Sequence, residues 1–359
     1  MLAFKRAKVV RILRKNSGRT DVLVDIDGES HRAIAYDALA GDVKVGDEVV
    51  VNTVALDLRL GSGGSHFVLW NLRLSDLAID GEGHIIKLRY TPLQLACLAV
   101  EEEVSPHHVR LKDAISIEGM PVIVGMLHSQ LAPAAAVLKY LSPSIKLAYL
   151  MTDGAALPIA LSDAVAELKE KGLLDLTITF GNAFGGDLEA VNVFSALVAA
   201  KVVGEADVAI TAMGPGIVGT DTLLGFTGME QGQIVNSVAS LGGIPIAIPR
   251  ISFGDRRPRH RGLSYHTEMA LGMAAQVRCK IAFPEMPAEK KAKIVEGIKR
   301  AKLEERHEIE FVDAGVLKKA LERFHLKPTT MGRGYEDDPE FFQAAAAAAV
   351  LALNYLESP

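Results

Sequence analysis

The sequence predicts an α/β protein in two parts, a small N-terminal β-barrel of SH3 or OB type and a doubly wound, mostly parallel Rossmann-like sheet. The chain has 359 residues, 49% of them hydrophobic, which is more than one compact core usually holds. Short β patterns fill the first 80 residues, whereas apolar runs alternate with long amphipathic segments after Gly83. We therefore expect a barrel domain at 1–82 and a Rossmann-like domain, with a C-terminal loop and helix, at 83–359.

The first part has the short strands and tight turns of a meander. Predicted strands are Val9–Leu13, Asp21–Ile26 and His31–Tyr36, and an Asp27-Gly28 turn joins the last two. Val43–Asn52 is a turn that feeds a further strand, as in small SH3-like or OB-like barrels.

Eight apolar runs in the second part are predicted strands, and several lack polar alternation, as expected for strands covered by helices on both faces. They are Ile85–Leu88, Pro121–Met126, Leu147–Met151, Leu176–Phe180, Asp207–Met213, Ile244–Ile251, Lys280–Phe283 and Ile309–Val312. A helix is predicted over Ser162–Lys171, capped by Ser162 and ended by Gly172, and Thr91-Pro92 is predicted to begin another. A final Ala-rich helix follows a loop that begins at Pro328.

Composition and charge narrow the class of protein. The net charge of −5 and the pI near 6.1 do not suit a protein that coats nucleic acid or an anionic membrane. Cys97 and Cys279 lack CxxC spacing, the N-terminus has no apolar block, and the Ala-rich run near 344–353 is shorter than the roughly 20 residues of a membrane span. We therefore predict a cytoplasmic protein that does not enter a membrane.

Polar, ionisable and Gly residues follow at least five of the predicted strands. These segments are 127–130, 152–154, 181–187, 214–222 and 252–261. Ligands of open α/β sheets bind beyond the carboxyl ends of the strands, where loops and helix N-termini converge. The sequence therefore predicts a site for a small anionic ligand at this edge of the sheet.

Two segments are candidates for holding the anion. Gly214, Gly216 and Gly219, with Thr220, form a Gly-rich loop that can cradle an anion, and a plain turn is the alternative. Pro215 removes an amide donor and no acidic residue ends the next strand to hold a ribose, so a nicotinamide or flavin is disfavoured and the cofactor stays unknown.

The second candidate is the densest cationic cluster of the chain. It comprises Arg256, Arg257, Arg259 and Arg261 with His260, and Arg250 and His266 are close in sequence. Guanidinium forks suit phosphate or carboxylate oxygens. A solvated loop that pairs with acidic surface groups is the alternative.

Acidic residues at four strand ends are candidates for moving protons or binding metal. They are Asp153, Asp187, Asp221 and Asp255, and Asn182 lies in one of the same loops. Helix capping explains any one of them equally well, so no metal site is assigned.

His128-Ser129-Gln130 resembles the centre of a nucleophile elbow, although Leu127 and Leu131 occupy the positions where an elbow needs Gly. Candidate acids and histidines follow Ser129 in hydrolase order, which keeps a serine hydrolase as one alternative function. Capping of the next helix is the other interpretation of Ser129. In the barrel, the Gly-rich segment 60–68 offers amides and the imidazole of His66, either to reach the α/β site or simply as a hairpin bend.

Motifs in order along nearly the whole chain resemble a bacterial family catalogued as domain of unknown function 3866. They include Leu60–Phe67, Lys87–Gln94, Leu127–Ser129, Met151–Pro158, Met213–Thr220, Arg250–Phe253, Arg256–Gly262 and Thr330–Gly334. The resemblance implies cytoplasmic proteins of this length and two-part build, and it supplies no activity. It draws attention to segment 330–334, from which we expect Arg333 to fold back toward the strand ends.

The leading functional hypothesis is an enzyme that acts on a small phosphorylated or carboxylated metabolite. Arg256, Arg257 and Arg259 would hold the anion, and Asp153, His260 or Asp187 would move protons. The alternative from another class is a ligand-sensing module whose barrel contacts a partner, with nucleic acid disfavoured but not excluded. Six basic residues near the N-terminus motivate that alternative: Lys5, Arg6, Lys8, Arg11, Arg14 and Lys15. A homodimer is expected from base rates alone.

Overall fold

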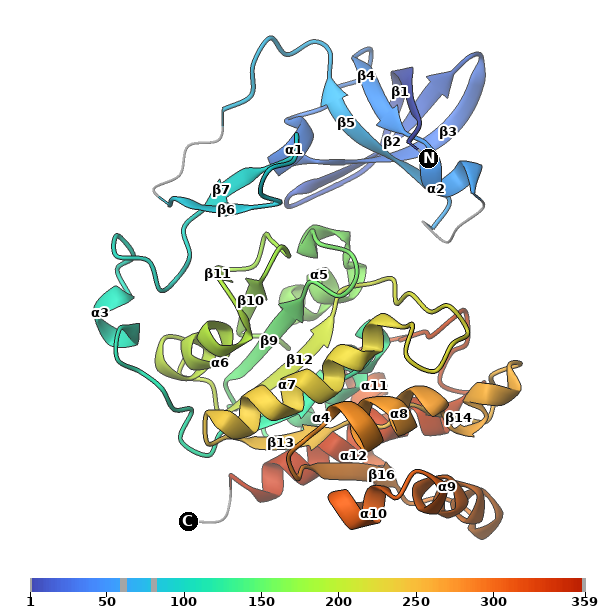
Figure 1. Cartoon of the computed structure of the whole chain (residues 1–359). Coiled ribbons are helices and arrows are strands. Elements are labelled where there is room, and N and C mark those ends of the chain that lie inside the picture. Colours follow the sequence, from blue (N-terminus) through green and yellow to red (C-terminus); the bar gives the residue numbers. More distant parts are fainter. Residues whose placement is uncertain (1, 59–62, 79–82, 357–359) are drawn as a thin grey trace. The chain divides into compact units, whose positions relative to one another are not determined.

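The computed structural model describes residues 2–58, 63–78 and 83–356 (Figure 1). The chain forms two compact units. Residues 1–82 and 88–96 belong to the first, called here the barrel unit, and residues 83–87 and 97–359 belong to the second, the sheet unit. Each unit has its own hydrophobic core.

The barrel unit is a closed five-stranded barrel in the order β1-β2-β3-β5-β4. Its strands are β1 (Phe4–Asn16), β2 (Arg19–Ile26), β3 (Glu29–Tyr36), β4 (Glu48–Asn52) and β5 (Ser65–Asn71), with short helices α1 (Asp37–Ala40) and α2 (Val54–Asp57). β3 and β5 run parallel, every other neighbouring pair is antiparallel, and β4 pairs back with β1. This connectivity is that of the Greek-key OB barrel, so it selects one of the two barrel types that the sequence predicts.

The turn between β2 and β3 has the geometry that its sequence demands. Asp27 and Gly28 have φ angles of 55° and 88°, the left-handed values that a two-residue hairpin turn needs. The predicted Gly-rich segment 60–68 falls partly on Gly61 and Ser62, which lie outside the described residues. Its end forms the start of β5, where His66 is 4% exposed.

The sheet unit contains one parallel sheet of eight strands in the order β11-β10-β9-β12-β8-β13-β16-β17. The strands are β8 (Pro121–Val124), β9 (Leu147–Thr152), β10 (Leu176–Phe180), β11 (Leu188–Ala190), β12 (Val208–Met213), β13 (Ile244–Ala247), β16 (Lys280–Pro284) and β17 (Glu308–Val312). The central residues of the six inner strands are buried, which explains their unbroken apolar runs, whereas the edge strands β11 and β17 are only partly buried. The predicted fold class is therefore confirmed.

Helices cover both faces of the parallel sheet (Figure 1). On one face lie α4 (Leu131–Leu141), α5 (Asp163–Glu170), α11 (Val316–Arg323) and α12 (Pro339–Asn354). On the other face lie α6 (Val193–Val202), α7 (Glu230–Ser240) and α8 (Tyr265–Met269). The remaining elements are α3 (His108–Leu111), α9 (Ala288–Arg300), α10 (Leu303–Arg306), β6 (Ile85–Lys87), β7 (Leu95–Cys97), β14 (Ile251–Ser252) and β15 (Gly262–Leu263).

Two local predictions are wrong. The run Ile85–Leu88 is not a strand of the parallel sheet, because its residues form β6 in a separate two-stranded sheet. Thr91-Pro92 does not begin a helix: Thr91 Oγ1 donates to the carbonyl of Leu88 and accepts from the amide of Leu93, which closes a turn instead. By contrast Ser162 caps α5 as predicted, accepting from the amide of Val165 at 3.0 Å.

The Ala-rich helix α12 is the most deeply buried helix segment of the C-terminal region. Ala344 to Ala349 are all 0% exposed, because side chains of this size let α12 approach the sheet and α4 closely. Pro339 stands at its first position, where no intrahelical amide is lost. None of the helices within the described residues is long and apolar enough to cross a membrane.

Candidate functional site

The candidate site lies at the carboxyl ends of the central strands β8 and β12, which are neighbours in the sheet. The chain leaves β8 toward β9 on one side and leaves β12 toward β13 on the other, so the direction of winding changes at this point. The two loops meet, since His128 Nδ1 lies 3.1 Å from the carbonyl oxygen of Met213. Ligand sites of doubly wound sheets occur where such loops converge.

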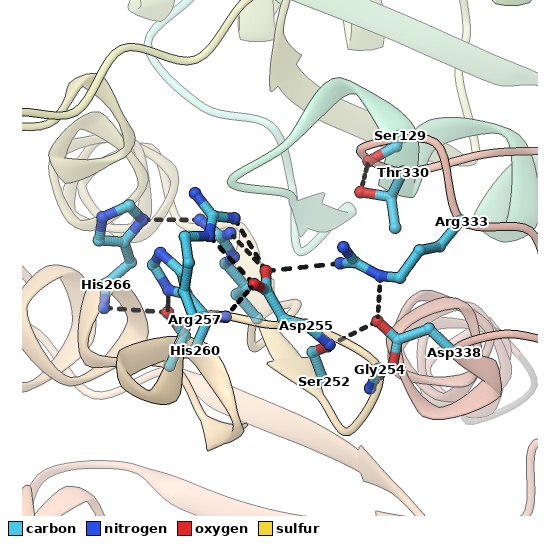
Figure 2. A network of polar contacts seen from close by, with 12 residues as sticks. Ser129, Ser252, Gly254, Asp255, Arg257, His260, His266, Thr330, Arg333 and Asp338 are labelled. Carbon is cyan, nitrogen blue, oxygen red and sulfur yellow. Dashed lines mark hydrogen bonds and ion pairs between the residues drawn. The ribbon is translucent and has the colours of Figure 1, made fainter.

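Three arginines lie around the buried carboxylate of Asp255, and Figure 2 shows two of them, Arg257 and Arg333, which come from separate segments. Arg257 donates through Nε at 3.0 Å and Nη2 at 2.8 Å. Nη2 of Arg250 lies 3.7 Å away and Nη2 of Arg333 lies 3.5 Å away. We call these residues, together with Asp338, the arginine cluster.

Asp338 holds the C-terminal segment against the loop that carries Asp255. Its carboxylate accepts from Ser252 Oγ at 2.6 Å, from the amides of Phe253 and Gly254, and from Arg333 Nε at 3.2 Å. A β-carbon at Gly254 would lie 2.6 Å from the carbonyl oxygen of Asp337, so only glycine permits this approach. Arg333 thus lies beside the Arg257 loop, and its part in ligand binding stays a prediction.

Burial and charge set the protonation of the cluster. Burial would raise the pKa of Asp255, but the hydrogen bonds from Arg257 and the charges of Arg257 and Arg333 outweigh it and hold that pKa well below its usual range. Burial lowers the pKa of Arg250 to about 10, and the hydrogen bond to Asp255 raises the pKa of Arg257. Arg250 and Arg257 are therefore charged at neutral pH, opposite the ionised carboxylate of Asp255.

Two buried histidines adjoin the arginines. His266 Nδ1 accepts from Arg250 Nη1 at 2.9 Å, and His260 Nδ1 lies 2.7 Å from Ser264 Oγ. Burial and the nearby charge of Arg250 lower the pKa of each imidazole to about 3. Both rings are neutral at physiological pH, and His266 stacks on Phe226 with ring centroids 3.8 Å apart. His260 therefore lacks the pKa near neutrality that its predicted proton-transfer role favours.

The Gly-rich loop after β12 lies between the arginine cluster and the loop after β9. A β-carbon at Gly214 would lie 2.5 Å from the carbonyl oxygen of Ala156, which explains why glycine stands there. A β-carbon at Gly219 would lie 3.9 Å from the His266 ring. The amide and hydroxyl of Thr220 both donate to the carbonyl of Gly225, so these two donors serve the loop itself. Gly216 adopts a φ of 109°, as only glycine does readily.

Two carboxylates lie close together at the end of β9, and we call Asp153 and Glu230 the carboxylate pair. Glu230 Oε1 accepts from Thr152 Oγ1 at 2.6 Å, and Asp153 accepts from the amide of Asn182 at 3.0 Å. Burial, with a smaller contribution from the charge of Asp153, raises the pKa of Glu230 to about 7. Glu230 was not among the predicted site residues, because an acidic residue at the start of a helix such as α7 is an ordinary capping feature.

Asp187 does not lie at the carboxyl edge, which corrects the predicted position. Its carboxylate accepts from the amide and hydroxyl of Thr177, near the amino end of β10, and pairs with Lys169. The loop 181–187 runs back along the strand before β11 begins, a return that the sequence does not reveal. Asp187 therefore has a structural role at the other end of β10.

The remaining candidates have separate partners. Arg259 pairs with Asp221 at 2.7 Å, and Arg256 is exposed. His128 donates through Nδ1 to Met213, and its Nε2 lies 2.6 Å from Ser162 Oγ, while burial lowers its pKa to about 4.

Ser129 has no histidine among its hydrogen-bond partners in the described residues, because its hydroxyl donates to Thr330 Oγ1 at 3.1 Å. These contacts give the hydrolase alternative no support. A cluster of three or more metal-ligating side chains does not occur within residues 2–58, 63–78 and 83–356.

Most basic side chains of β1 in the barrel unit are paired with acids. The pairs are Lys5–Asp27, Arg6–Glu48, Arg14–Asp21 and Lys15–Asp42, each within 3.7 Å. His66 is half of a ring pair with His31, at 5.2 Å between centroids. Because acidic partners neutralise these side chains, β1 attracts polyanions less strongly than a row of unpaired basic side chains would.

The fold, with the loops at the carboxyl edge of its parallel sheet, defines a two-unit α/β protein that has an OB-type barrel and a doubly wound sheet. The chain belongs to the family described as "Protein of unknown function (DUF3866)", whose sequence model matches residues 32–349. A search of curated proteins found no match.

Proposed function

We propose that this chain is an enzyme that acts on a small phosphorylated or carboxylated molecule bound at the carboxyl edge of the parallel sheet. The observation that carries the proposal is the convergence of Arg250, Arg257 and Arg333 on a cluster that holds only two carboxylates. The excess positive charge favours an anion that reaches the cluster.

Arg257 and Arg333 are the residues that would touch the ligand. Arg257 uses Nε and Nη2 on Asp255, and Arg333 uses Nε on Asp338 and Nη2 on Asp255. Within the part of the chain that the structure describes, Nη1 of each side chain has no acceptor. The side chains are 40% and 20% exposed, so an oxyanion can accept from both.

Proton transfer is assigned to Glu230 with Asp153 beside it. A carboxyl group with a pKa of about 7 exchanges protons readily at neutral pH, which neither His260 nor Asp187 does. The loop 214–229 joins this pair to the arginine cluster, since Gly219 approaches His266 and Thr227 lies in the turn just before Glu230. A single substrate that lies along this loop would therefore contact both the anion-binding and the proton-transfer groups.

Thermal unfolding in the presence of anions tests the binding step. Inorganic phosphate, pyrophosphate and citrate should raise the Tm of the wild type above a sodium chloride control of equal ionic strength. Arg257→Ala and Arg333→Ala should each lose that rise relative to their own Tm without ligand. Arg256→Ala is the matched control from the same loop and should keep it. No rise with any anion, or an undiminished rise in both cluster variants, rejects the anion site.

Turnover of a pool of phosphorylated and carboxylated metabolites, followed by mass spectrometry, tests the enzymatic step. Wild type should consume a member of the pool that Glu230→Gln leaves intact. From its composition we further propose that the protein is cytoplasmic and has a domain boundary between residues 82 and 83. From the base rate of homodimers we propose that it is a dimer. Light scattering on the purified chain tests the dimer.

A further inference from the structure

A pocket of about 730 Å³ opens between helix α11 and segment 327–337. Leu321 and Leu326 are its buried lining residues, and Pro328 and Tyr335 complete an apolar floor. Its volume falls within the roughly 300–1,000 Å³ typical of small-molecule sites. The pocket lies outside the residues assigned above to anion binding and proton transfer.

The rim of the pocket carries charges of both signs. Lys318 pairs with Glu336 across 3.8 Å, and Lys327, Glu322 and Asp337 are exposed. With two lysines against three carboxylates, the rim has no excess of positive charge that would select for an anion. The apolar floor of the pocket therefore determines which kind of ligand binds, and it favours a molecule with a mainly apolar body.

The Tyr335 ring gives the floor a fixed flat surface. Its hydroxyl accepts from Gln343 Nε2 at 3.3 Å, and its ring lies against Phe342 with centroids 6.4 Å apart. A ring that is held on one side offers its other face for stacking at low entropic cost. A flat, aromatic body is the shape that this surface accommodates best.

One wall of the pocket is the segment that carries Arg333. Thr330 and Arg333 exchange backbone hydrogen bonds of 2.8 and 2.9 Å, and the amide of Gly334 donates to Asp337 Oδ2. The same short segment sends Thr330 to Ser129 and Arg333 to the arginine cluster (Figure 2). A molecule that packs against 327–337 therefore acts on the backbone that positions the Arg333 guanidinium.

We propose that this pocket binds a small molecule with a flat, mainly apolar body, and that the bound molecule fixes the position of Arg333. The inference does not depend on the proposed enzyme function. It needs only the pocket and the covalent continuity between its wall and Arg333. Because such coupling is reciprocal, changes at Arg333 also alter binding in the pocket.

Indole is the probe for the test, with the full chain in phosphate-free buffer. Saturation-transfer NMR should give a dissociation constant for wild type that rises at least about tenfold in Thr329→Trp, whose new ring fills the pocket from its exposed rim. Tyr335→Ala should weaken binding as well. Lys319→Trp, exposed on α11 but absent from the pocket lining, is the matched control and should bind like wild type.

The coupling to Arg333 has a separate readout. The Nε–H resonance of Arg333, assigned through its loss in Arg333→Lys, should shift as indole saturates the wild type and stay unmoved in Thr329→Trp. Equal affinities of wild type, Thr329→Trp and Tyr335→Ala for indole overturn the proposal that the pocket binds it. Indole binding that leaves the Arg333 resonance unchanged overturns the proposal that the bound molecule fixes the position of Arg333. Neither result bears on whether anions bind the arginine cluster.

Discussion

The arginine cluster and the carboxylate pair lie at the same edge of one sheet, and burial raises the pKa of a carboxyl group in each, yet the two carboxyl groups have opposite net pKa shifts. In the cluster, buried Asp255 stays ionised because the guanidinium groups of Arg250, Arg257 and Arg333 outweigh the effect of burial. In the pair, burial raises the pKa of Glu230, the charge of Asp153 adds to the rise, and the hydrogen bond from Thr152 opposes it only in part. Whether a buried carboxyl group is ionised thus depends on whether its partners outweigh burial. Substitutions at the two places should therefore change the free energy of unfolding by amounts that differ in size, sign and pH dependence.

The largest loss of stability is expected from Asp338→Ala. The change leaves the Ser252 hydroxyl, two backbone amides and Nε of Arg333 without their acceptor. Breaking a buried, hydrogen-bonded charge pair costs about 3–5 kcal/mol. Urea unfolding measures the difference, with exposed Asp337→Ala as the control at a small fraction of that cost. Equal losses in the two variants would show that the cluster does not hold segment 330–338.

Acid should weaken the cluster through Asp255. Because its pKa is lowered in the folded state, the carboxylate contributes stability that is present above the unfolded value near 4 and is lost as the pH falls below it. A lowered carboxyl pKa of this kind contributes about 2–3 kcal/mol. Unfolding free energies of wild type should fall between pH 5 and pH 2.5 more steeply than those of Asp255→Asn. Parallel curves would contradict the ion pairing.

Glu230→Gln should have the opposite sign and stabilise the fold. A carboxyl whose pKa is raised to about 7 costs no stability below pH 4, and the cost grows as the pH rises toward 7 and stays constant above it. The glutamine removes that cost, so we expect a gain of roughly 1–3 kcal/mol at pH 8 and none at pH 4. Exposed Glu304→Gln is the control and should show no such difference. A gain that does not depend on pH would point to packing instead of ionisation.

Local signals in the sequence were sufficient for most of the fold. Gly172 and Ser162 mark the ends of α5, and unbroken apolar runs mark the strands, since these features act within a few residues. The short strands β6 and β11 have three residues each, which is too short a run to show a distinctive period. Periodicity alone therefore predicts the main strands and helices of this fold but not the short strands β6 and β11.

The site could be predicted only in outline. The strand-end rule located the loops, and their Arg and Gly content located the anion candidates. Asp187 lies away from the carboxyl edge because loop 181–187 turns back, whereas α7 brings its first residue, Glu230, to the end of β9. The ties from Asp338 to Ser252 and from Arg333 to Asp255 join residues about eighty positions apart. A single sequence contains no local signal for such pairs.

The smallest effect is expected from Ser129→Ala, which removes one hydrogen bond to Thr330. A neutral, partly buried hydrogen bond contributes about 0.5–1.5 kcal/mol, because folding exchanges it for bonds to water. Thr330→Val should cost a similar amount, and the double variant should cost less than the sum, since both changes delete the same contact. Urea unfolding of the four proteins measures this coupling. Additive losses would mean that the segment carrying Arg333 is held by the Asp338 contacts alone, which would make the arginine cluster the sole anchor of that segment.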